Sequence, residues 1–235
     1  MAETLDVHGY VLHSRAWKES SLLLDIFSLE KGLIRASARG AKKDIKKHSL
    51  AQLLQPYAAL KLKLASSHDY YHLQSADSLE PRLALTGDAS LCAFYCNELL
   101  MRLLPERDAH TELFNQYRNT LHALLVSKDF ANELRSFECV LIESLGYSID
   151  FQHDKTGNAV IPEAFYRVHE DGVSRVVSTD NLCVTGLSLM RMANKQWSLE
   201  PECSKSIFRQ LLLPHLGDKP LQSKDLWLAK KRLTV

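Results

Sequence analysis

Apolar and polar residues alternate with a period of two along most of the first 80 residues. This alternation predicts five short strands, at residues 9–13, 20–28, 33–39, 57–65 and 70–78. Gly32 lies in the turn before the third strand, where glycine can take a positive φ, and Pro56 stands at the entrance of the fourth strand, where a missing N–H does least harm. Five short strands in so few residues are typical of a small β-barrel.

The alternation also divides the third and fourth strands into an apolar face and a cationic face. Ile34 and Leu62 fall on the apolar face, and the residues beside them fall on the other. The loop at residues 40–49 joins the two strands and adds four lysines. We therefore predict one continuous basic surface, formed by Arg35, Arg39, Lys42, Lys43, Lys46, Lys47, Lys61 and Lys63.

After residue 81 the spacing of apolar residues changes from two to about 3.6, the period of an α-helix. The new spacing predicts three antiparallel helices, at residues 91–103, 113–124 and 130–145. Pro105 ends the first of them, and Gly146 is expected to cap the third.

Residues 147–180 are less regular, with short strands predicted at 160–161 and 173–177. Helical spacing returns at residues 185–194 and 202–216, where Pro214 should kink the last turn, and residues 224–235 are expected to fray. The predicted fold class is α+β. A five-stranded OB-type barrel occupies a domain at residues 1–80, and a mainly helical domain at residues 81–235 contains the irregular insertion at 147–180.

Composition adds a charge asymmetry to this picture. The chain has 235 residues, of which 46% are hydrophobic, so it can bury a sizeable core. Its formal net charge is only +1, but residues 31–63 carry +8, which leaves −7 for all the others, so the basic segment is where we expect a charged partner. The sequence has no apolar run of eighteen residues, no signal-peptide pattern at its N-terminus and no C-x-x-C among five cysteines, and we expect a cytoplasmic protein that does not contact a membrane.

The usual sequence signatures of catalysis are absent, including G-x-x-x-x-G-K-[ST], G-x-S-x-G, H-E-x-x-H and G-x-G-x-x-G. Cys92 and Cys96 stand four apart on a predicted helix, but no nearby Cys or His completes a zinc site, so we assign them to the core. Glu19, Asp25 and Glu30 are single carboxylates near turns, without a partner for acid–base chemistry. We predict no enzymatic activity and no cofactor, since a metal-dependent nuclease would need a carboxylate cluster.

A basic surface on a five-stranded barrel is typical of OB-type domains that follow a phosphate backbone. Tyr57, Tyr70 and Tyr71 lie on or beside the basic strands, where they either stack on bases or belong to the core. Two alternatives to DNA binding stay open. The lysines form a solvated loop, or the ligand is RNA, because the sequence does not reveal contacts to a 2′-hydroxyl group.

Longer stretches of the sequence carry a family resemblance. They are G-Y-V-L-H-S-R-A-W-K-E-S-S-L-L-L-D-I-F-S-L-E-K-G at residues 9–32, L-I-R-A-S-A-R-G-A-K-K directly after it, and three further stretches at residues 95–117, 134–147 and 215–224. In this order, and over nearly the whole chain, they resemble the bacterial recombination mediator family RecO.

The resemblance implies an N-terminal OB domain, a central helical domain and a non-enzymatic task in DNA repair and recombination. Members of the family bind single- and double-stranded DNA, anneal complementary strands and help to load the RecA recombinase onto strands coated by single-stranded-DNA-binding protein, with RecR as co-mediator. Many relatives carry a four-cysteine zinc site after the third helix, where this chain has S-I-D-F-Q-H-D-K-T-G at residues 148–157. We therefore predict no zinc and expect this segment to be held by packing.

The family also implies a docking site for the acidic C-terminal tail of single-stranded-DNA-binding protein, which requires an apolar pocket with a cation at its lip. Arg135 is the expected cation, with Leu99, Leu103, Phe114 and Tyr117 as walls. Two plainer readings stay open. The four wall residues belong to the core of a helix bundle, and Arg135 forms an exposed pair with Glu138 at i+3.

Overall fold

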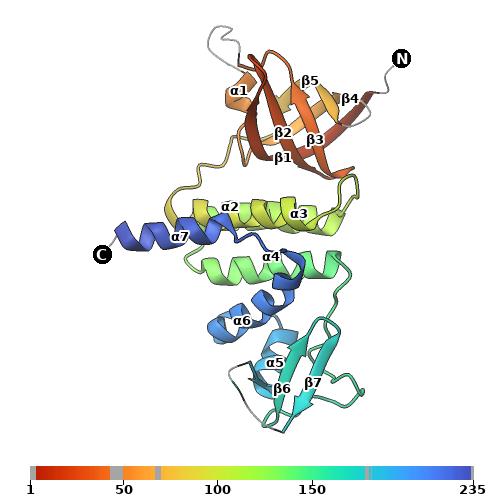
Figure 1. The fold of residues 1–235 in the computed structure, drawn as a ribbon, viewed down its shortest axis with the longest axis vertical. Coiled ribbons are helices and arrows are strands. Elements are labelled where there is room, and N and C mark those ends of the chain that lie inside the picture. Colours follow the sequence, from red (N-terminus) through yellow and green to blue (C-terminus); the bar gives the residue numbers. More distant parts are fainter. Residues whose placement is uncertain (1–3, 43–49, 67–69, 178–179, 181, 234–235) are drawn as a thin grey trace. The chain divides into compact units, whose positions relative to one another are not determined.

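The structure is a computed structural model that describes residues 4–42, 50–66, 70–177, 180 and 182–233 (Figure 1). The chain divides into two compact units. Residues 1–125 and 221–235 form the first, here called the barrel unit, and residues 126–220 form the second, here called the insertion unit. The predicted domains at 1–80 and 81–235 divide the chain by type of secondary structure, whereas compactness groups the first two long helices with the barrel.

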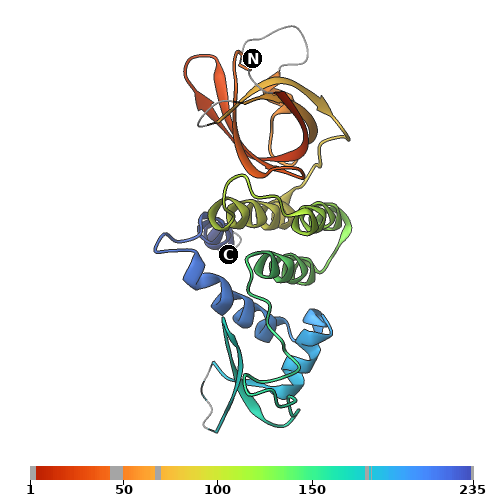
Figure 2. The ribbon, with the colours of Figure 1, turned by 90° about the vertical axis from the view of Figure 1, so that its right-hand side faces the viewer.

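The predicted fold class is confirmed, since the first five strands close into a barrel in the order β1-β2-β3-β5-β4 (Figures 1 and 2). The strands are β1 (Thr4–Trp17), β2 (Ser21–Ser28), β3 (Gly32–Ala38), β4 (Ala59–Ala65) and β5 (Tyr71–Ser78). Neighbours pair antiparallel except β3 and β5, which pair parallel. The short helix α1 (Leu50–Leu53) and the fully buried Leu54 pack against the barrel core, which includes Val7, Val11, Leu24, Ile26, Ile34, Leu60, Leu62 and Leu64.

Two helices of the barrel unit, α2 (Gly87–Leu103) and α3 (Thr111–Val126), continue the chain. Phe114 and Tyr117 of α3 meet Tyr10 of β1 and Phe27 of β2, with ring centroids 5.4 to 6.0 Å apart. Tilted and edge-on pairs of this kind contribute about 0.5–1.5 kcal/mol each beyond the burial of their surface. The outer face of β1 and β2 is therefore part of a second apolar core at this point.

A β-bulge in β1 creates the polar contact between the barrel and these helices. The pairing of β1 with β2 shifts register between Val11 and His13, so Leu12 has no partner in the ladder. The Leu12 carbonyl accepts a hydrogen bond of 2.8 Å from the Asn97 amide of α2, and Asn97 accepts one of 2.6 Å from the Tyr117 hydroxyl. All three residues are buried, so the helices satisfy a backbone group that the bulge leaves unpaired.

The turn before β3 fits closely against the connection between α2 and α3. Gly32 has a φ of 62°, as its place in the predicted turn suggested. A Cβ atom at this position would lie 1.6 Å from the carbonyl oxygen of Asp108, so only glycine fits. One residue further on, the carbonyl of Leu33 accepts a hydrogen bond of 2.8 Å from the Arg107 amide.

The C-terminal segment forms the helix α7 (Gln222–Leu233), so the prediction that it frays is wrong. The buried Glu98 of α2 accepts hydrogen bonds from the amides of Gln222 and Ser223, at 2.7 and 3.0 Å, and from the Ser223 hydroxyl at 2.7 Å. A carboxylate at the N-terminus of a helix satisfies free amides and favours the helix dipole. Lys230 adds an ion pair to Asp88 at the other end of α7.

The insertion unit begins with α4 (Phe130–Ser144), which ends in the predicted glycine cap. Gly146 has a φ of 89°, and the amides of Gly146 and Tyr147 donate to the carbonyls of Glu143 and Ile142, which is a Schellman motif. The unit continues with the strands β6 (Phe165–His169), β7 (Gly172–Val176) and β8 (Val184–Thr185), the helices α5 (Gly186–Ala193) and α6 (Pro201–Leu212), and 3-10 turns at Trp197–Leu199 and Leu213–His215.

Three sequence predictions in this unit met different outcomes. The strand at 173–177 corresponds to β7, whereas 160–161 is not a strand and β6 was not predicted. Pro214 lies in the 3-10 turn that follows the end of α6 at Leu212, so the α-helix stops there instead of bending. Among the helices within the described ranges, none combines the length and the apolar content needed to cross a bilayer.

The contact at the β1 bulge gives a stability prediction. Asn97→Ala removes the donor to the buried Leu12 carbonyl and should lower the free energy of unfolding by about 1–3 kcal/mol. Urea denaturation followed by circular dichroism measures this change. Asn119→Ala, an exposed asparagine of α3, is the matched control and should change stability by less than about 0.5 kcal/mol. Equal effects of the two substitutions would contradict the role given to Asn97.

Candidate nucleic-acid interface

The two strands that carry the predicted basic residues are not neighbours. The barrel order places β5 between β3 and β4 on one side, and β1 and β2 between them on the other. The basic residues of the two strands therefore form separate rows rather than one. Lys43, Lys46 and Lys47 lie outside the described residues, so their part of the predicted surface stays a prediction.

Lys61 and Lys63 are exposed on β4, but acidic residues stand beside them. The strand registers place Asp77 of β5 opposite Lys61 and Asp6 of β1 opposite Lys63. Directly opposed residues have Cβ atoms about 4.5–5.5 Å apart, well inside the distance over which charges act in salt solution. Each lysine of this row thus has a carboxylate opposite it on a neighbouring strand.

Arg35 of β3 takes part in ion pairs within the barrel unit. Its guanidinium lies 3.1 Å from Asp25 on β2 and 3.2 Å from Glu106, which follows α2. His13 of β1 approaches the same Asp25 at 3.4 Å. Two carboxylates around one guanidinium leave no excess positive charge, so Arg35 is a weak candidate for a phosphate contact.

Arg39 and Lys42 lie in the turn that follows β3, and both are exposed. The Lys42 amide donates a hydrogen bond of 3.1 Å to the carbonyl of Ser20, so this turn lies against the turn between β1 and β2. Lys18 lies in this second turn, and Arg15 lies near the end of β1. Both are exposed. We call Arg15, Lys18, Arg39 and Lys42 the basic turn cluster.

The basic turn cluster differs from the two rows because no strand register places a carboxylate opposite its cations, and Arg15 pairs with Leu23. Within the part of the chain that the structure describes, no ion pair within 4.0 Å involves its four cationic groups, and the same is true of Lys61 and Lys63. Glu19 is the one acidic residue among the described residues of its two turns. Arg15 and Lys18 were not predicted because they lie outside the charge-rich segment at 31–63, and only the alternation at the end of β1 points to them.

The tyrosines proposed as stacking residues are mostly core residues. Tyr57 and Tyr71 are buried, and burial raises the pKa of Tyr57 to about 12. Tyr71 carries the Arg107 guanidinium over its ring at 5.4 Å. Tyr70 is half-buried and meets the His72 ring edge-on at 5.2 Å. The core reading therefore applies to Tyr57 and Tyr71.

The residues predicted for docking of the acidic tail are distributed over both units. Leu99 and Tyr117 have no exposed surface, Phe114 is buried beside the Tyr117 ring, and Leu103 is half-buried, all in the barrel unit. In this conformation Leu99 and Tyr117 cannot touch a peptide. Arg135 belongs to α4 of the insertion unit, and the assignment of these residues to one site stays a prediction.

Arg135 pairs with Glu138, but the pair is buried rather than exposed as expected. The guanidinium contacts both carboxylate oxygens at 2.7 Å and lies over the Phe208 ring at 5.7 Å. The two side chains are 10% and 1% exposed. Of the two contacts, the one from the guanidinium Nη2 to Oε1 is a hydrogen bond, and the other is a close ion pair. A buried pair is sensitive to the loss of one member because the other charge stays in a poorly solvated place.

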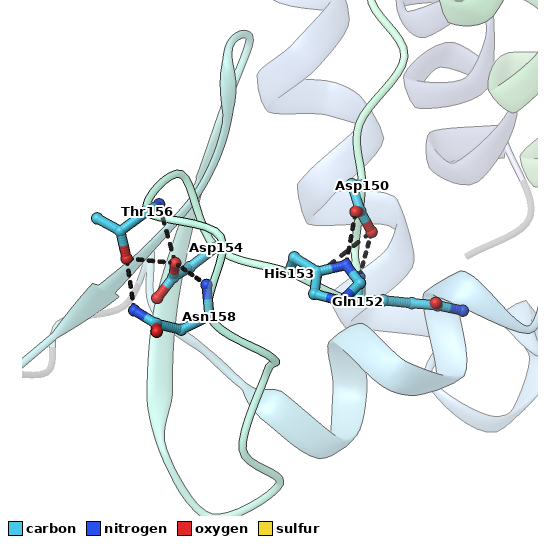
Figure 3. Close-up of polar contacts among 6 residues, drawn as sticks. All are labelled: Asp150, Gln152, His153, Asp154, Thr156 and Asn158. Atoms are coloured by element: carbon cyan, nitrogen blue, oxygen red, sulfur yellow. Dashed lines mark hydrogen bonds and ion pairs between the residues drawn. The ribbon is translucent and has the colours of Figure 1, made fainter.

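Hydrogen bonds to aspartates, rather than packing alone, hold the segment at residues 148–157, where zinc was not expected (Figure 3). Asp150 accepts hydrogen bonds from the Gln152 amide at 2.7 Å and from the His153 ring at 2.8 Å. Asp154 accepts from the amides of Thr156 and Asn158 at 2.9 and 3.0 Å. These carboxylates fix the backbone turns of this segment.

This segment does not suit a zinc ion. Between residues 148 and 157 the only Cys or His is His153, and its ring is bonded to Asp150. Among the described residues, no three Cys, His, Asp or Glu side chains are grouped closely enough to hold a metal. A structural zinc site needs four such ligands.

Comparisons with known proteins agree over nearly the whole chain. The family model Recombination protein O N terminal matches residues 1–82, and Recombination protein O C terminal matches residues 84–224. The chain is 37% identical to DNA repair protein RecO of Pseudoalteromonas atlantica, with 94% of this chain and 93% of that protein covered. It is 35% identical to DNA repair protein RecO of Pseudomonas putida strain W619, with 97% and 99% covered, and 32% identical to that of Methylococcus capsulatus, with 94% and 91% covered.

The buried pair gives a second stability prediction. Arg135→Ala should lower the free energy of unfolding by about 3–5 kcal/mol because it removes the partner of a buried carboxylate. Adding Glu138→Gln should restore part of the loss, since the remaining side chain is then neutral. Urea denaturation measures both variants. Arg209→Ala, an exposed arginine of α6, is the control and should stay within about 0.5 kcal/mol of the original protein.

The aspartate turns give a prediction on pH. Backbone and side-chain hydrogen bonds hold the pKa of Asp150 and the pKa of Asp154 below their usual range. A lowered pKa stabilises the fold above the ordinary aspartate pKa near 3.8, and this stabilisation is lost as the pH falls through the folded-state pKa. The urea midpoint should therefore fall between pH 5 and pH 2, and it should fall less in Asp150→Asn/Asp154→Asn.

The buried Trp197 of the insertion unit serves as the reporter for this measurement. Replacing the other two tryptophans by phenylalanine, Trp17→Phe and Trp227→Phe, leaves its fluorescence as the only tryptophan signal. An identical pH dependence with and without the two asparagine substitutions would show that these aspartates do not stabilise the unit.

Proposed function

Because the chain belongs to the recombination protein O family, as its sequence resemblance indicated, we propose that it is a cytoplasmic, non-enzymatic mediator of DNA repair and homologous recombination. It binds single- and double-stranded DNA through the barrel unit and anneals complementary strands. With RecR, it helps to load RecA onto strands coated by single-stranded-DNA-binding protein. The relatives described above carry the name DNA repair protein, which supports this assignment.

The observation that supports the DNA-binding part is the cluster of exposed cations on the barrel. The basic turn cluster has four exposed cations and, among the described residues of its two turns, one acidic residue, in a chain whose net charge is only +1. Phosphate groups are the natural partner of such a patch, and each phosphate contact releases condensed counterions from DNA. The proposed main contacts are Arg15, Lys18, Arg39 and Lys42, together with Lys43, Lys46 and Lys47 of the predicted basic surface. Arg35, Lys61 and Lys63 of that surface stand beside carboxylates and are proposed to contribute less.

Strand annealing follows from the same charge. Two complementary strands repel each other through their phosphates, and this repulsion opposes pairing at low salt. A positive surface that holds both strands screens the repulsion and raises their local concentration, so pairing becomes faster without any bond being made or broken by the protein.

Docking of the acidic tail of single-stranded-DNA-binding protein is proposed at Arg135. The buried pair sets a condition for this role, because the tail carboxylate has to replace Glu138 as the partner of the guanidinium. Such an exchange keeps the arginine paired with an anion throughout, and it needs an opening of the surface around α4. The predicted apolar walls at Leu103 and Phe114 belong to the same proposal, whereas Leu99 and Tyr117, which are fully buried, would have to become exposed before they could contact the tail.

A salt-dependent titration tests the proposed function. With about five phosphate contacts, the logarithm of the affinity for duplex DNA should fall with the logarithm of the salt concentration with a slope of about −4 to −5. Fluorescence anisotropy of labelled oligonucleotides measures this slope. Magnesium should cause no strand cleavage in the same samples. An absence of binding at low salt would reject the proposal, and a preference for RNA in competition would favour an RNA-binding protein instead.

A further inference from the structure

We propose that single-stranded DNA is held at the end of the barrel where the basic turn cluster surrounds Trp17, and that an unpaired base stacks on the Trp17 ring. This inference rests on the proposed DNA-binding function. It goes beyond that function because it assigns one surface of the barrel and one aromatic residue to the single-stranded ligand.

The β1 bulge is what places Trp17 on the outside of the barrel. Before the bulge, Val11 faces the core and pairs with the buried Ile26. After the bulge, Ser14 pairs with the buried Leu24, so the odd-numbered residues Arg15 and Trp17 face outward. Without the extra residue of the bulge, the alternation along β1 would direct the Trp17 side chain into the barrel.

Strand registers bring Trp17 and the cations together. Trp17 is the last residue of β1 and pairs with Ser21 of β2, and the β2–β3 register at Leu22 and Ala38 continues toward Arg39. Two strand spacings, about 10 Å, therefore separate Trp17 from Arg39. Lys18 follows Trp17 directly in the chain, so cations flank the ring on two sides.

Trp17 is exposed in a way that packing does not explain. Its side chain is 40% exposed, whereas Trp197 is 2% exposed. No other ring of the described residues packs against it. A large aromatic ring at the centre of a cationic surface is the arrangement that single-stranded nucleic acids recognise, because cations follow the backbone and the ring accepts a base.

The distribution of charge favours phosphate binding at the basic turn cluster rather than at the basic residues of β3 or β4. Arg35 is paired with Asp25 and Glu106, and the lysines of β4 stand beside Asp6 and Asp77. A phosphate that bound at either row would meet carboxylates as well as cations. At the basic turn cluster it meets four cations, and Glu19 is the one acidic residue among the described residues of the two turns. Stacking then adds a preference for single strands, since bases in a duplex already stack on one another.

The experiment compares substitutions at the ring and at the cations. Trp17→Leu keeps apolar bulk but removes the aromatic face, and it should weaken binding of a thymidine oligomer about 5- to 10-fold while changing duplex affinity less than about 2-fold. Trp17→Phe should retain most of the affinity. Quenching of tryptophan fluorescence by the oligomer should be largely lost in both variants, because Trp17 is the ring that the base covers.

Arg39→Ala/Lys42→Ala tests the cations, with Lys61→Ala/Lys63→Ala as the matched control on β4. The first pair should weaken binding of single strands and duplex alike and reduce the single-strand salt slope by about 1.4. The control pair should change affinity and slope less. Melting temperatures of all variants should match the original protein, because every substituted side chain is exposed.

The outcomes separate this inference from the proposed function. Loss of binding in the β4 pair, with normal binding in Trp17→Leu and Arg39→Ala/Lys42→Ala, would overturn the assigned surface and leave the proposed function intact. Equal loss of single-strand and duplex binding in Trp17→Leu would overturn the stacking role. If the original protein binds no DNA at low salt, the proposed function itself fails.

Discussion

The hydrogen bond from Asn97 to the Leu12 carbonyl is the contact on which the arrangement of the barrel unit depends. It satisfies the carbonyl of Leu12, the residue that the β1 bulge leaves without a ladder partner, and the Tyr117 hydroxyl donates a hydrogen bond to the same Asn97 side chain. The bulge thus has two consequences. It ties α2 and α3 to one part of the barrel wall, and it reverses which residues face outward along the rest of β1. The wall is thereby divided into a part covered by helices and a part available to a ligand.

Much of the fold could be predicted from local pattern, and the parts that could not depend on distant contacts. Period-two alternation located all five barrel strands, and the glycines at 32 and 146 marked the turn and the cap. The strand order was not predictable, because alternation identifies a strand but not its neighbours. The helix α7 was missed because its N-terminus is satisfied by Glu98, more than 120 residues earlier in the chain. A segment of low apolar content gives no sign of a partner that far away.

The candidate site illustrates the same limit. The concentration of charge at residues 31–63 indicated a basic surface. The electrostatic potential of a surface, however, depends on all the charges that lie near it in the folded structure, including those from distant parts of the sequence. Arg35 meets two carboxylates, and Lys61 and Lys63 each stand opposite an acidic residue on a neighbouring strand. Arg15 and Lys18, outside the dense segment, stand beside Arg39 and Lys42 because a backbone hydrogen bond joins the two turns. The carboxylates on neighbouring strands therefore determine which cations we expect to bind phosphate.

The cations of this protein therefore fall into groups that would respond differently to an anionic partner. Arg35 and Arg135 already hold carboxylates, so a phosphate or a peptide carboxylate that binds them has to displace an internal partner. Displacement costs the interaction energy of the existing pair. For the buried pair of Arg135, it also removes the arginine from Glu138 while that carboxylate remains in a poorly solvated environment. The basic turn cluster has no such partner within the described ranges, so a phosphate that binds there displaces only water and counterions. The proposed function, in which DNA is taken up and released repeatedly, would gain from contacts of the second kind, because they form and break without disturbing the fold.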